Sequence, residues 1–390
     1  MRKPAGLTAL LILAVAPGCS SRTLVVSPEA ASVPGEAWTW ELPPGFSEPV
    51  VPADNPMSAV KVELGRHLFY DRRLSGNGTF SCADCHAQER AFTDGRGRAR
   101  GSTGQIHPRS AMSLTNVAFN ATLGWADPSL ETLESQARVP LFNQTPVELG
   151  LAGREEEMLG RLRSVPRYRD LFAASFPEQA DPIELPNVLR ALASFERTLI
   201  SGDSPYDRFT FHDDRDALSG SARRGMRLFF SDRVPCSKCH AGFNFSGPVR
   251  FQEMRTPRPI FHNTGLYNLD GSGGVPRDNP GLAEHTGRRR DRGRFRAPTL
   301  RNIAVTAPYM HDGSISTLEG VVDHYARGGR LIESGPFAGD GSLSPQKSEI
   351  IEGFEITTEE KADLVTFLRS LTDERFLRDP RFSSPQRSSP

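Results

Sequence analysis

Apolar residues recur at helical spacing in several stretches of the chain, and this spacing predicts helices there. In the segment 317–325 they stand at positions i, i+3, i+4 and i+7, namely Leu318, Val321, Val322 and Tyr325. This spacing places the apolar side chains on one face of a short amphipathic helix. We therefore expect Tyr325 on the buried face and His324 off it.

Two similar segments each predict a glycine-containing helix. One runs Gly65-Arg-His-Leu68-Phe69-Tyr70-Asp-Arg72, and the other runs Gly225-Met-Arg-Leu228-Phe229-Phe230-Ser-Asp-Arg233. The similarity indicates an internal repeat. Because glycine lacks a side chain, we expect another helix to approach closely at each of these helices.

Each repeat unit also ends in a predicted helix, over 185–200 in the first and 358–371 in the second. Thr357 or Thr358 can cap the second of these helices, and acidic residues follow in its first turn. The pattern predicts an all-α chain built from two similar units.

The composition of the remaining segments predicts how these units are arranged along the chain. The segment 201–215 contains Gly202, Pro205 and four aspartates, which is typical of a linker. We expect a signal peptide over 1–19, an extended arm over 20–55, a first domain over 56–200, a linker over 201–215, a second domain over 216–375 and a disordered tail over 376–390.

Each unit carries one complete CxxCH motif, Cys82-Ala-Asp-Cys85-His86 in the first and Cys236-Ser-Lys-Cys239-His240 in the second. Two thiols at this spacing reach the two vinyl groups of one porphyrin, and the adjacent imidazole binds the iron. A redox CxxC or half of a zinc site is the alternative, but zinc needs four ligands. The sequence therefore predicts two covalent c-type haems with His86 and His240 as iron ligands.

The fifth cysteine, Cys19, follows a signal-like N-terminus. Arg2 and Lys3 precede an apolar run over 7–16 that is too short to span a bilayer. Small residues lead into Cys19, which predicts lipid attachment there, with ordinary cleavage nearby as the alternative. We expect a periplasmic protein that is lipid-anchored to the bacterial envelope.

The charge balance limits the possible partners. The chain has 47 basic and 47 acidic residues and a formal net charge of zero. Neither nucleic acid nor an acidic membrane surface is implied by this balance. Any partner surface must therefore be local.

The sixth ligands of the two irons decide whether the chain is an enzyme or an electron carrier. For the second haem, Tyr325 lies on an apolar face, where a tyrosine is ordinarily part of the core. Met310 and His311 are rival ligands in the nearby loop. The residues alone leave these alternatives open.

The chain resembles the bacterial di-haem cytochrome c peroxidase and MauG family over residues 56–373. Besides both CxxCH sites, the resemblance rests on Leu64-Gly65-Arg66, Leu133-Glu-Ser-Gln136, Phe295-Arg-Ala-Pro298-Thr299-Leu300-Arg301-Asn302 and Thr306-Ala-Pro308-Tyr309-Met310-His311-Asp-Gly313. Trp38-Thr-Trp40, Phe92-Thr-Asp-Gly95 and Trp125-Ala-Asp-Pro128 are most similar to its MbnH-like branch. The resemblance implies two cytochrome c-like domains whose haems face each other across a calcium-bearing interface.

The resemblance also implies the iron ligands. Tyr325 matches the tyrosine ligand of the six-coordinate haem in MauG, where the peroxidases have methionine. The peroxidases have a labile distal histidine at a place that matches Ser102, so the first haem is expected to be five-coordinate. His107 is the alternative ligand because it could still swing in. The open face of the first haem would be the peroxide site.

Three further residues match catalytic positions of the family. Glu148 matches the catalytic glutamate, although two extra residues separate it from Gln136, which matches the distal glutamine. A carboxylate near the iron can move a proton between the peroxide oxygens. Trp125 matches the tryptophan between the haems. The alternative for Glu148 is a surface glutamate, and the alternative for Trp125 is an ordinary core tryptophan.

The family's calcium site has only a partial match. Thr306 and Pro308 match the two carbonyl donors, but Ser110 stands where the family has asparagine. MauG also sends holes out through a tryptophan just before the second CxxCH, where this chain has Val234 and Pro235. Trp38 and Trp40 either pack the arm against the domains or form part of a partner surface.

Three functions follow from these interpretations. The favoured one is a MauG-like enzyme that uses hydrogen peroxide, through a high-valent di-haem intermediate, to oxidise a residue of a partner protein, with tryptophan favoured. The second is a cytochrome c peroxidase that reduces peroxide with electrons from a small redox protein. The third is a non-enzymatic di-haem electron carrier, which would need both irons six-coordinate.

Overall fold

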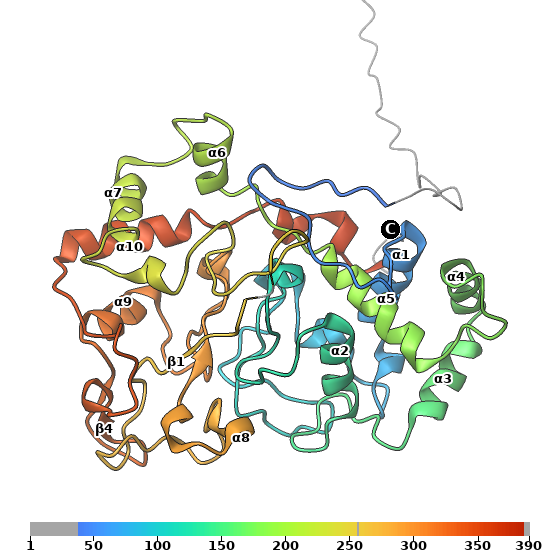
Figure 1. Cartoon of the computed structure of the whole chain (residues 1–390). Helices are drawn as coiled ribbons and strands as arrows, with labels where there is room; N and C mark the ends of the chain where they lie inside the picture. The colour runs from blue at the N-terminus through green and yellow to red at the C-terminus, as the bar shows by residue number, and fades with distance from the viewer. Residues whose placement is uncertain (1–37, 256, 386–390) are drawn as a thin grey trace, which may run out of the picture. The chain divides into compact units, whose positions relative to one another are not determined.

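Short helices joined by long loops make up the protein (Figure 1). The computed structural model describes residues 38–255 and 257–385. Within these ranges the α-helices are α1 Ala59–Phe69, α2 Leu133–Phe142, α3 Glu155–Arg163, α4 Pro166–Ser175, α5 Leu185–Arg197, α6 Pro205–Phe211, α7 Gly220–Phe229, α8 Ala283–Thr286, α9 Leu318–Ala326 and α10 Thr358–Arg369.

The strands are only two residues long. β1 Phe261–His262 pairs with β2 Phe295–Arg296, and β3 Leu331–Ile332 pairs with β4 Gly339–Asp340, both antiparallel. A strand of two residues is too short to show the alternation that predicts a strand. The prediction of an all-α chain therefore missed both pairs, and the fold is mostly helical.

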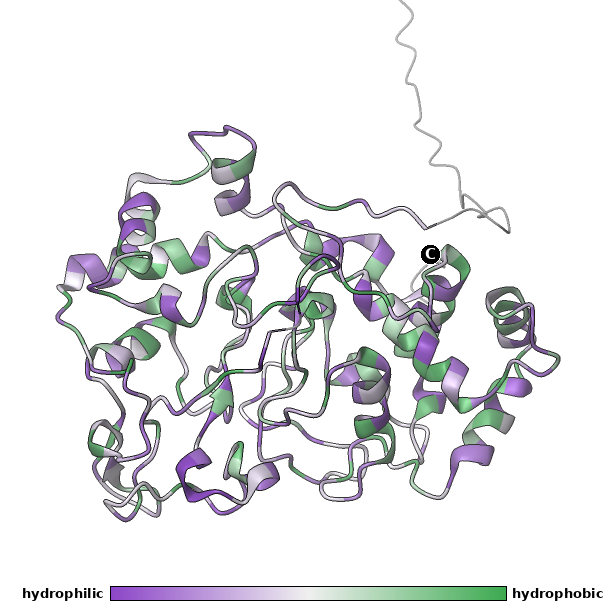
Figure 2. Cartoon of the chain, viewed as in Figure 1, coloured by the Kyte–Doolittle hydropathy of each residue, from purple (hydrophilic) through white to green (hydrophobic). Residues whose placement is uncertain are grey.

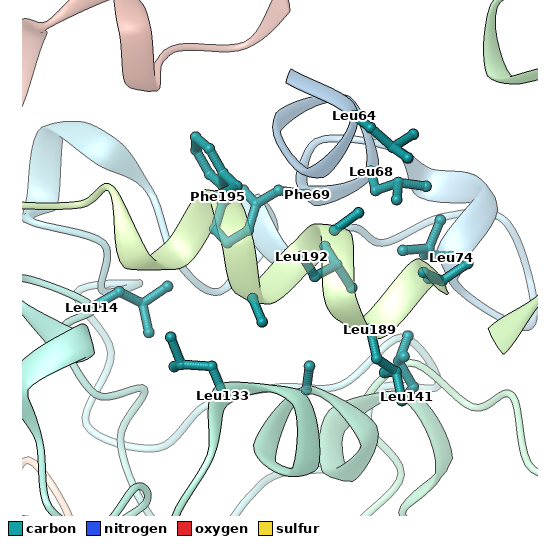
Figure 3. Packing of buried hydrophobic residues seen from close by; sticks show 14 of the residues in the cluster. Leu64, Leu68, Phe69, Leu74, Leu114, Leu133, Leu141, Leu189, Leu192 and Phe195 are labelled. Atoms are coloured by element: carbon teal, nitrogen blue, oxygen red, sulfur yellow. The ribbon is translucent and has the colours of Figure 1, made fainter. Parts of the chain in front are cut away.

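The first helix pair is α1 and α5, which cross at Gly65. A Cβ atom at Gly65 would lie 1.9 Å from the carbonyl oxygen of Ala191, so only glycine allows this approach. The apolar side chains of α1, α2 and α5 point toward one another around this crossing (Figure 3). The expected close approach at this helix is confirmed.

The second helix pair, α7 and α10, repeats this arrangement. A Cβ atom at Gly225 would lie 2.0 Å from the carbonyl oxygen of Asp363. Phe229 and Phe367 are fully buried beside this crossing, with ring centroids 5.2 Å apart. The helices carry hydrophobic and hydrophilic residues together, as expected of helices with one buried side (Figure 2).

The predicted ends of two helices agree with the structure to within three residues. α5 ends at Arg197 and α10 ends at Arg369. Thr357 caps α10 and forms a capping box with Glu360. The expectation for α9 was wrong at its C-terminal end, because His324 is 5% exposed while Tyr325 borders a cavity and is only partly buried.

Two other predictions about the chain's organisation need correction. The segment 201–215 is not a plain loop, because it contains α6, whose Asp207 forms a buried ion pair with Arg301. The tail is ordered as far as residue 385. Phe376 and Phe382 are buried and belong to the first hydrophobic cluster, so the chain returns to the first helix pair at its end.

The part of the predicted arm that the structure describes, residues 38–55, contains no helix or strand. Phe46 contacts the rings of Phe119 and Phe243 and lies under the guanidinium of Arg301. The arm is thus held against both halves of the fold. The predicted signal peptide and Cys19 lie outside the described residues. Within residues 38–255 and 257–385, no helix is both long and apolar enough to cross a membrane.

Candidate functional site

The first CxxCH motif forms a tight turn at the edge of a cavity. Residues Cys82–Asp84 form a 3₁₀ turn, and the amide of His86 donates to the carbonyl of Cys82 at 2.9 Å. Asp84 accepts hydrogen bonds from the amide and hydroxyl of Ser81, which fixes the start of the turn. Cys82, Cys85 and His86 then border a cavity of about 720 Å³.

The imidazole of His86 is prepared to bind a metal. Its Nδ1 lies 2.8 Å from the carbonyl oxygen of Phe92, which accepts the Nδ1 proton and leaves Nε2 with its lone pair. Burial lowers the pKa of His86, so the ring is neutral. A neutral, oriented imidazole is the form that ligates iron.

Gln136 and Glu148 border the same cavity from different elements. Gln136 lies on α2, whereas Glu148 lies in a loop held by backbone hydrogen bonds. The amide of Ser102 donates to the carbonyl of Glu148 at 2.7 Å, and a Cβ atom at Gly101 would lie 1.9 Å from the carbonyl oxygen of Val147. The two extra residues before Glu148 therefore do not remove it from the cavity.

The side chain of Glu148 has an unexpected neighbour in His107. Their Oε1 and Nε2 atoms are 3.8 Å apart, and both residues border the cavity. Burial raises the pKa of Glu148 to about 7 and lowers the pKa of His107 to about 4. At neutral pH the imidazole is therefore neutral, and the carboxyl group is balanced between its two forms.

Arg109 lies away from the first cavity. Its guanidinium donates to Asn279 at 2.8 Å and to Glu284 at 2.5 Å, so it joins the segment that follows His107 to the second half of the chain. The sequence could not show this pairing, because the partners are more than 165 residues away.

The second CxxCH motif repeats the geometry of the first. Cys236–Lys238 forms a 3₁₀ turn, and the amide of His240 donates to the carbonyl of Cys236 at 3.0 Å. Nδ1 of His240 lies 3.1 Å from the carbonyl oxygens of both Phe245 and Pro298. Burial lowers the pKa of His240 to about 4, so this ring is also neutral.

All three candidate sixth ligands border the second cavity, which measures about 1690 Å³. The ring of His311 stacks on Phe295 with centroids 3.7 Å apart, and Met310 sits in the loop at a φ of 69°. No hydrogen bond joins the Tyr325 hydroxyl to another described residue. Burial and the nearby Cys239 and Cys236 thiols raise its pKa, so it would ionise only against a cation such as iron.

The polar atoms around the second cavity fit a large apolar group with anionic edges. Nη1 of Arg296 and Nε2 of His311 are buried without a hydrogen-bond partner in the described part of the chain, and both residues border the second cavity. A haem carries two carboxylates that can accept from such donors. With thiols and a neutral imidazole in each cavity, the residues fit c-type haem.

Trp125 borders the second cavity and not the first. Its Nε1 donates to the carbonyl of Ser110 at 2.9 Å, and its ring contacts His311 edge-on at 6.4 Å. The amide of Ser110 in turn donates to the carbonyl of His311. Trp125 therefore joins a loop of the first half to a loop of the second.

The predicted calcium ligands Ser110, Thr306 and Pro308 border this same cavity. The set supplies three neutral oxygens, so waters would have to complete the six to eight oxygens that calcium takes. Within the described residues there is no cluster of three or more acidic, cysteine or histidine side chains that could hold a metal. The calcium site stays a prediction.

Two haem-type attachment turns, each beside its own cavity in a mostly helical fold, define the class of di-haem c-type proteins. The sequence profile of the di-haem cytochrome c peroxidases matches residues 59–215. The chain is 34% identical to the methylamine utilization protein MauG of Methylorubrum extorquens over 323 residues, which cover 83% of this chain and 81% of that protein. The chain belongs to the di-haem cytochrome c peroxidase and MauG family, whose members are haem-dependent peroxidases.

Two further relatives show the range of the family. The cytochrome-c peroxidase IdrP1 of a Pseudomonas species is 34% identical, with 83% of each chain covered. A crystal structure described as a MauG-like protein associated with microbial copper homeostasis is 48% identical, with a TM-score of 0.88. The match covers 90% of this chain and all of that one.

Proposed function

We propose that this protein uses two covalent c-type haems and hydrogen peroxide to oxidise a residue of a partner protein, with tryptophan as the favoured target. The observation that carries the proposal is Tyr325, which borders the cavity beside the second CxxCH motif and whose hydroxyl has no hydrogen-bond partner among the described residues. An anionic oxygen ligand favours higher oxidation states of iron, which suits an oxidising enzyme better than a carrier. The similarity to MauG and to a MauG-like structure supports the same choice.

The proposed haem sites divide between the two halves. Cys82 and Cys85 attach the first haem, and His86 binds its iron. Cys236 and Cys239 attach the second, with His240 and Tyr325 as iron ligands. The haems supply iron that binds peroxide and exchanges electrons.

Peroxide chemistry is proposed for the first cavity, where Glu148 and Gln136 lie. A carboxyl group with a pKa of about 7 can both accept and return a proton at neutral pH. Gln136 offers an amide to orient peroxide. His107 beside Glu148 is neutral, so it forms no ion pair that would keep the carboxyl group permanently ionised. Trp125 is the proposed relay between the haems, because its ring is oxidisable and bridges the two halves.

The remaining sequence predictions are carried forward as parts of this proposal. They are two cytochrome c-like domains, export to the periplasm, lipid attachment at Cys19 and membership of the MbnH-like branch. The partner would be recognised at a local surface, because the net charge of the chain is zero.

The second candidate is a cytochrome c peroxidase that takes electrons from a small redox protein. It is favoured by the relatives named cytochrome-c peroxidase, which are as similar to this chain as MauG is. The non-enzymatic carrier is not carried forward, because the family consists of enzymes.

Electron paramagnetic resonance of the ferric holoprotein tests the proposal. We expect one high-spin and one low-spin haem, and one equivalent of hydrogen peroxide should produce an optical change without prior reduction. The new species should persist alone and decay faster when N-acetyltryptophanamide is added. Two low-spin haems that ignore peroxide until one is reduced would instead support the cytochrome c peroxidase.

A further inference from the structure

A second carboxyl group, Glu196, borders the first cavity and has no assigned role. It lies in the last turn of α5 and is 6% exposed. Its Oε2 atom is buried without a partner, and within the described residues its carboxyl group makes neither a hydrogen bond nor an ion pair. Buried polar groups are nearly always hydrogen-bonded, so such a group requires an explanation.

No ion pair with a neighbouring charge explains how Glu196 tolerates burial. Arg197, the next residue, donates instead to Glu134 of α2 at 2.6 and 2.8 Å. Only Nη2 of Arg197 is used in that pair; its Nη1 is buried without a partner, and no hydrogen bond joins it to Glu196. The carboxyl of Glu196 borders the cavity near the Cys82 thiol, and it makes no ion pair with Arg197 or with Arg100, which borders the same cavity.

The two carboxyl groups of the cavity act on different cysteines. Burial raises the pKa of Cys82 most, followed by Glu196; burial also raises the pKa of Cys85 most, followed by Asp94 and then Glu148. Among the carboxyl groups that border the cavity, Glu196 is thus the one near Cys82 and Glu148 the one near Cys85. Glu196 reaches the cavity from α5 and Glu148 reaches it from the loop after α2.

The charge state of Glu196 follows from this environment. The pKa of Glu196 is raised to about 8, because the effect of burial, helped slightly by the carboxylate of Glu134, exceeds the opposing effect of Arg197. Near pH 7 the group is therefore mostly a neutral acid, which can donate a hydrogen bond or a proton. A neutral acid also explains how the side chain tolerates burial without an ion-pair partner.

We infer that Glu196 is a second proton-holding carboxyl group of the first cavity and supplies a proton to the peroxide step. The inference rests on the peroxide chemistry of the proposed function. Glu148, as a carboxylate, takes one proton from hydrogen peroxide. Cleavage of the O–O bond would need two electrons, which the bound haems would supply, and the outer oxygen, which keeps its own hydrogen, would take the proton of Glu196 and leave as water. The proton on Glu148 then returns through water to Glu196.

Infrared spectroscopy of the holoprotein tests whether Glu196 holds a proton. Neutral carboxylic acids have a C=O band that ionised carboxylates lack, and this band shifts in D₂O. We expect Glu196→Gln to remove one such band at pH 7, Glu196→Asp to retain it at a shifted position, and the exposed Glu178→Gln control to leave the spectrum unchanged. Retention of every wild-type band in Glu196→Gln would overturn the inference.

Stopped-flow mixing with hydrogen peroxide tests whether that proton is used. Loss of a positioned general acid predicts a rate constant about tenfold to a hundredfold lower in Glu196→Gln, with Glu196→Asp in between. An unchanged rate constant in Glu196→Gln would also overturn the inference. If the wild type itself ignores peroxide, the proposed function fails, while the infrared band still decides the protonation of Glu196. If Glu196→Gln does not incorporate haem, Glu196→Asp is used instead. Its infrared spectrum then shows whether residue 196 holds a proton, and its rate constant shows whether that proton is used.

Discussion

The two cavities share one scaffold and differ in the residues that face their CxxCH turns. Each has a 3₁₀ turn, a neutral histidine and a pair of helices that cross at a glycine. Besides the turn's own histidine, the first is bordered by two carboxyl groups, from Glu148 and Glu196, and by the side chains of Gln105, Gln136, His107 and Arg100. The described residues around the second include no Asp or Glu, but they include Tyr325 and Arg296.

This difference separates two kinds of chemistry. Carboxyl groups with pKa values near 7 and 8 can move protons, which peroxide cleavage requires. A tyrosine hydroxyl and the unpartnered donors of Arg296 and His311 can hold an iron and its carboxylate-bearing ring, but they supply no proton relay at neutral pH. Both repeat units therefore keep the CxxCH turn for haem attachment. The loops around the two turns differ, and this difference suits each proposed haem to a separate role.

The largest expected effect comes from Glu148→Gln, which removes the proton acceptor from the first cavity. The rate constant with peroxide should fall by about a hundredfold or more. In the wild type the rate should rise with pH through about 7, because the carboxylate form of Glu148 is the acceptor and forms above its pKa, and it should fall again above about pH 8, where Glu196 loses the proton that it donates. Stopped-flow measurements from pH 5 to 9 check this, with Glu178→Gln as the control. If the rate constant still rises with pH in the same way in Glu148→Gln, the group that titrates near pH 7 is not Glu148.

The buried ion pairs of the two halves allow a comparison of stability. Asp207→Asn leaves Arg301, which is fully buried, without its carboxylate and should lower the free energy of unfolding by about 3–5 kcal/mol. Glu134→Gln breaks the pair with Arg197 in the first half, where the carboxylate side chain is 19% exposed. We expect a smaller loss there, because water can reach the pair. Urea unfolding of both variants measures the difference, and equal losses would contradict it.

The glycine crossings test whether the two helix pairs are equivalent. Gly65→Ala and Gly225→Ala place a methyl group about 2 Å from a backbone carbonyl, which cannot move freely. Each should cost about 1–3 kcal/mol of the free energy of unfolding. Gly160→Ala in α3 is the control, because no atom outside its own helix lies within 4 Å, and it should stabilise the fold by about 0.5–1 kcal/mol. Loss at only one crossing would show that the repeat is not symmetric.

The smallest energetic effect is expected from Tyr325→Phe. Its hydroxyl has no hydrogen-bond partner in the described chain, so unfolding of the protein without haem should change by less than about 1 kcal/mol. In the holoprotein, the low-spin signal of the second haem should change while the signal of the first stays the same. Paramagnetic resonance measures both signals in one sample. An unaltered second haem would point to Met310 or His311 as its ligand.

Local patterns in the chain predicted much of the fold. The spacing of apolar residues located α9, and the repeated glycine segments located α1 and α7 together with their close contacts. These predictions succeed because helical periodicity and the space around a glycine depend on residues within a few turns of one another. The ends of the helices and the two-residue strands were less predictable, because capping and short pairings compete with similar local alternatives.

The candidate site divides in the same way. Cys82, Cys85 and His86 form one local motif, and so do Cys236, Cys239 and His240, so the sequence by itself determined both haem attachments. Glu148, Gln136 and Trp125 could be selected only through resemblance. Tertiary packing decides which cavity each of these residues borders: Gln136 and Glu148 border the first cavity, and Trp125 borders the second.

Only the tertiary structure revealed the contact of His107 with Glu148, the unpartnered Glu196, the buried pair of Asp207 and Arg301, and the return of Phe382 to the first core. These features join residues distant in sequence, or depend on which side chain remains without a partner once its neighbours are paired. Periodicity and motif spacing carry no information about such contacts. The sequence therefore determined where the two haem-attachment motifs stand, and the packing of the loops around them decided which cavity is bordered by carboxyl groups.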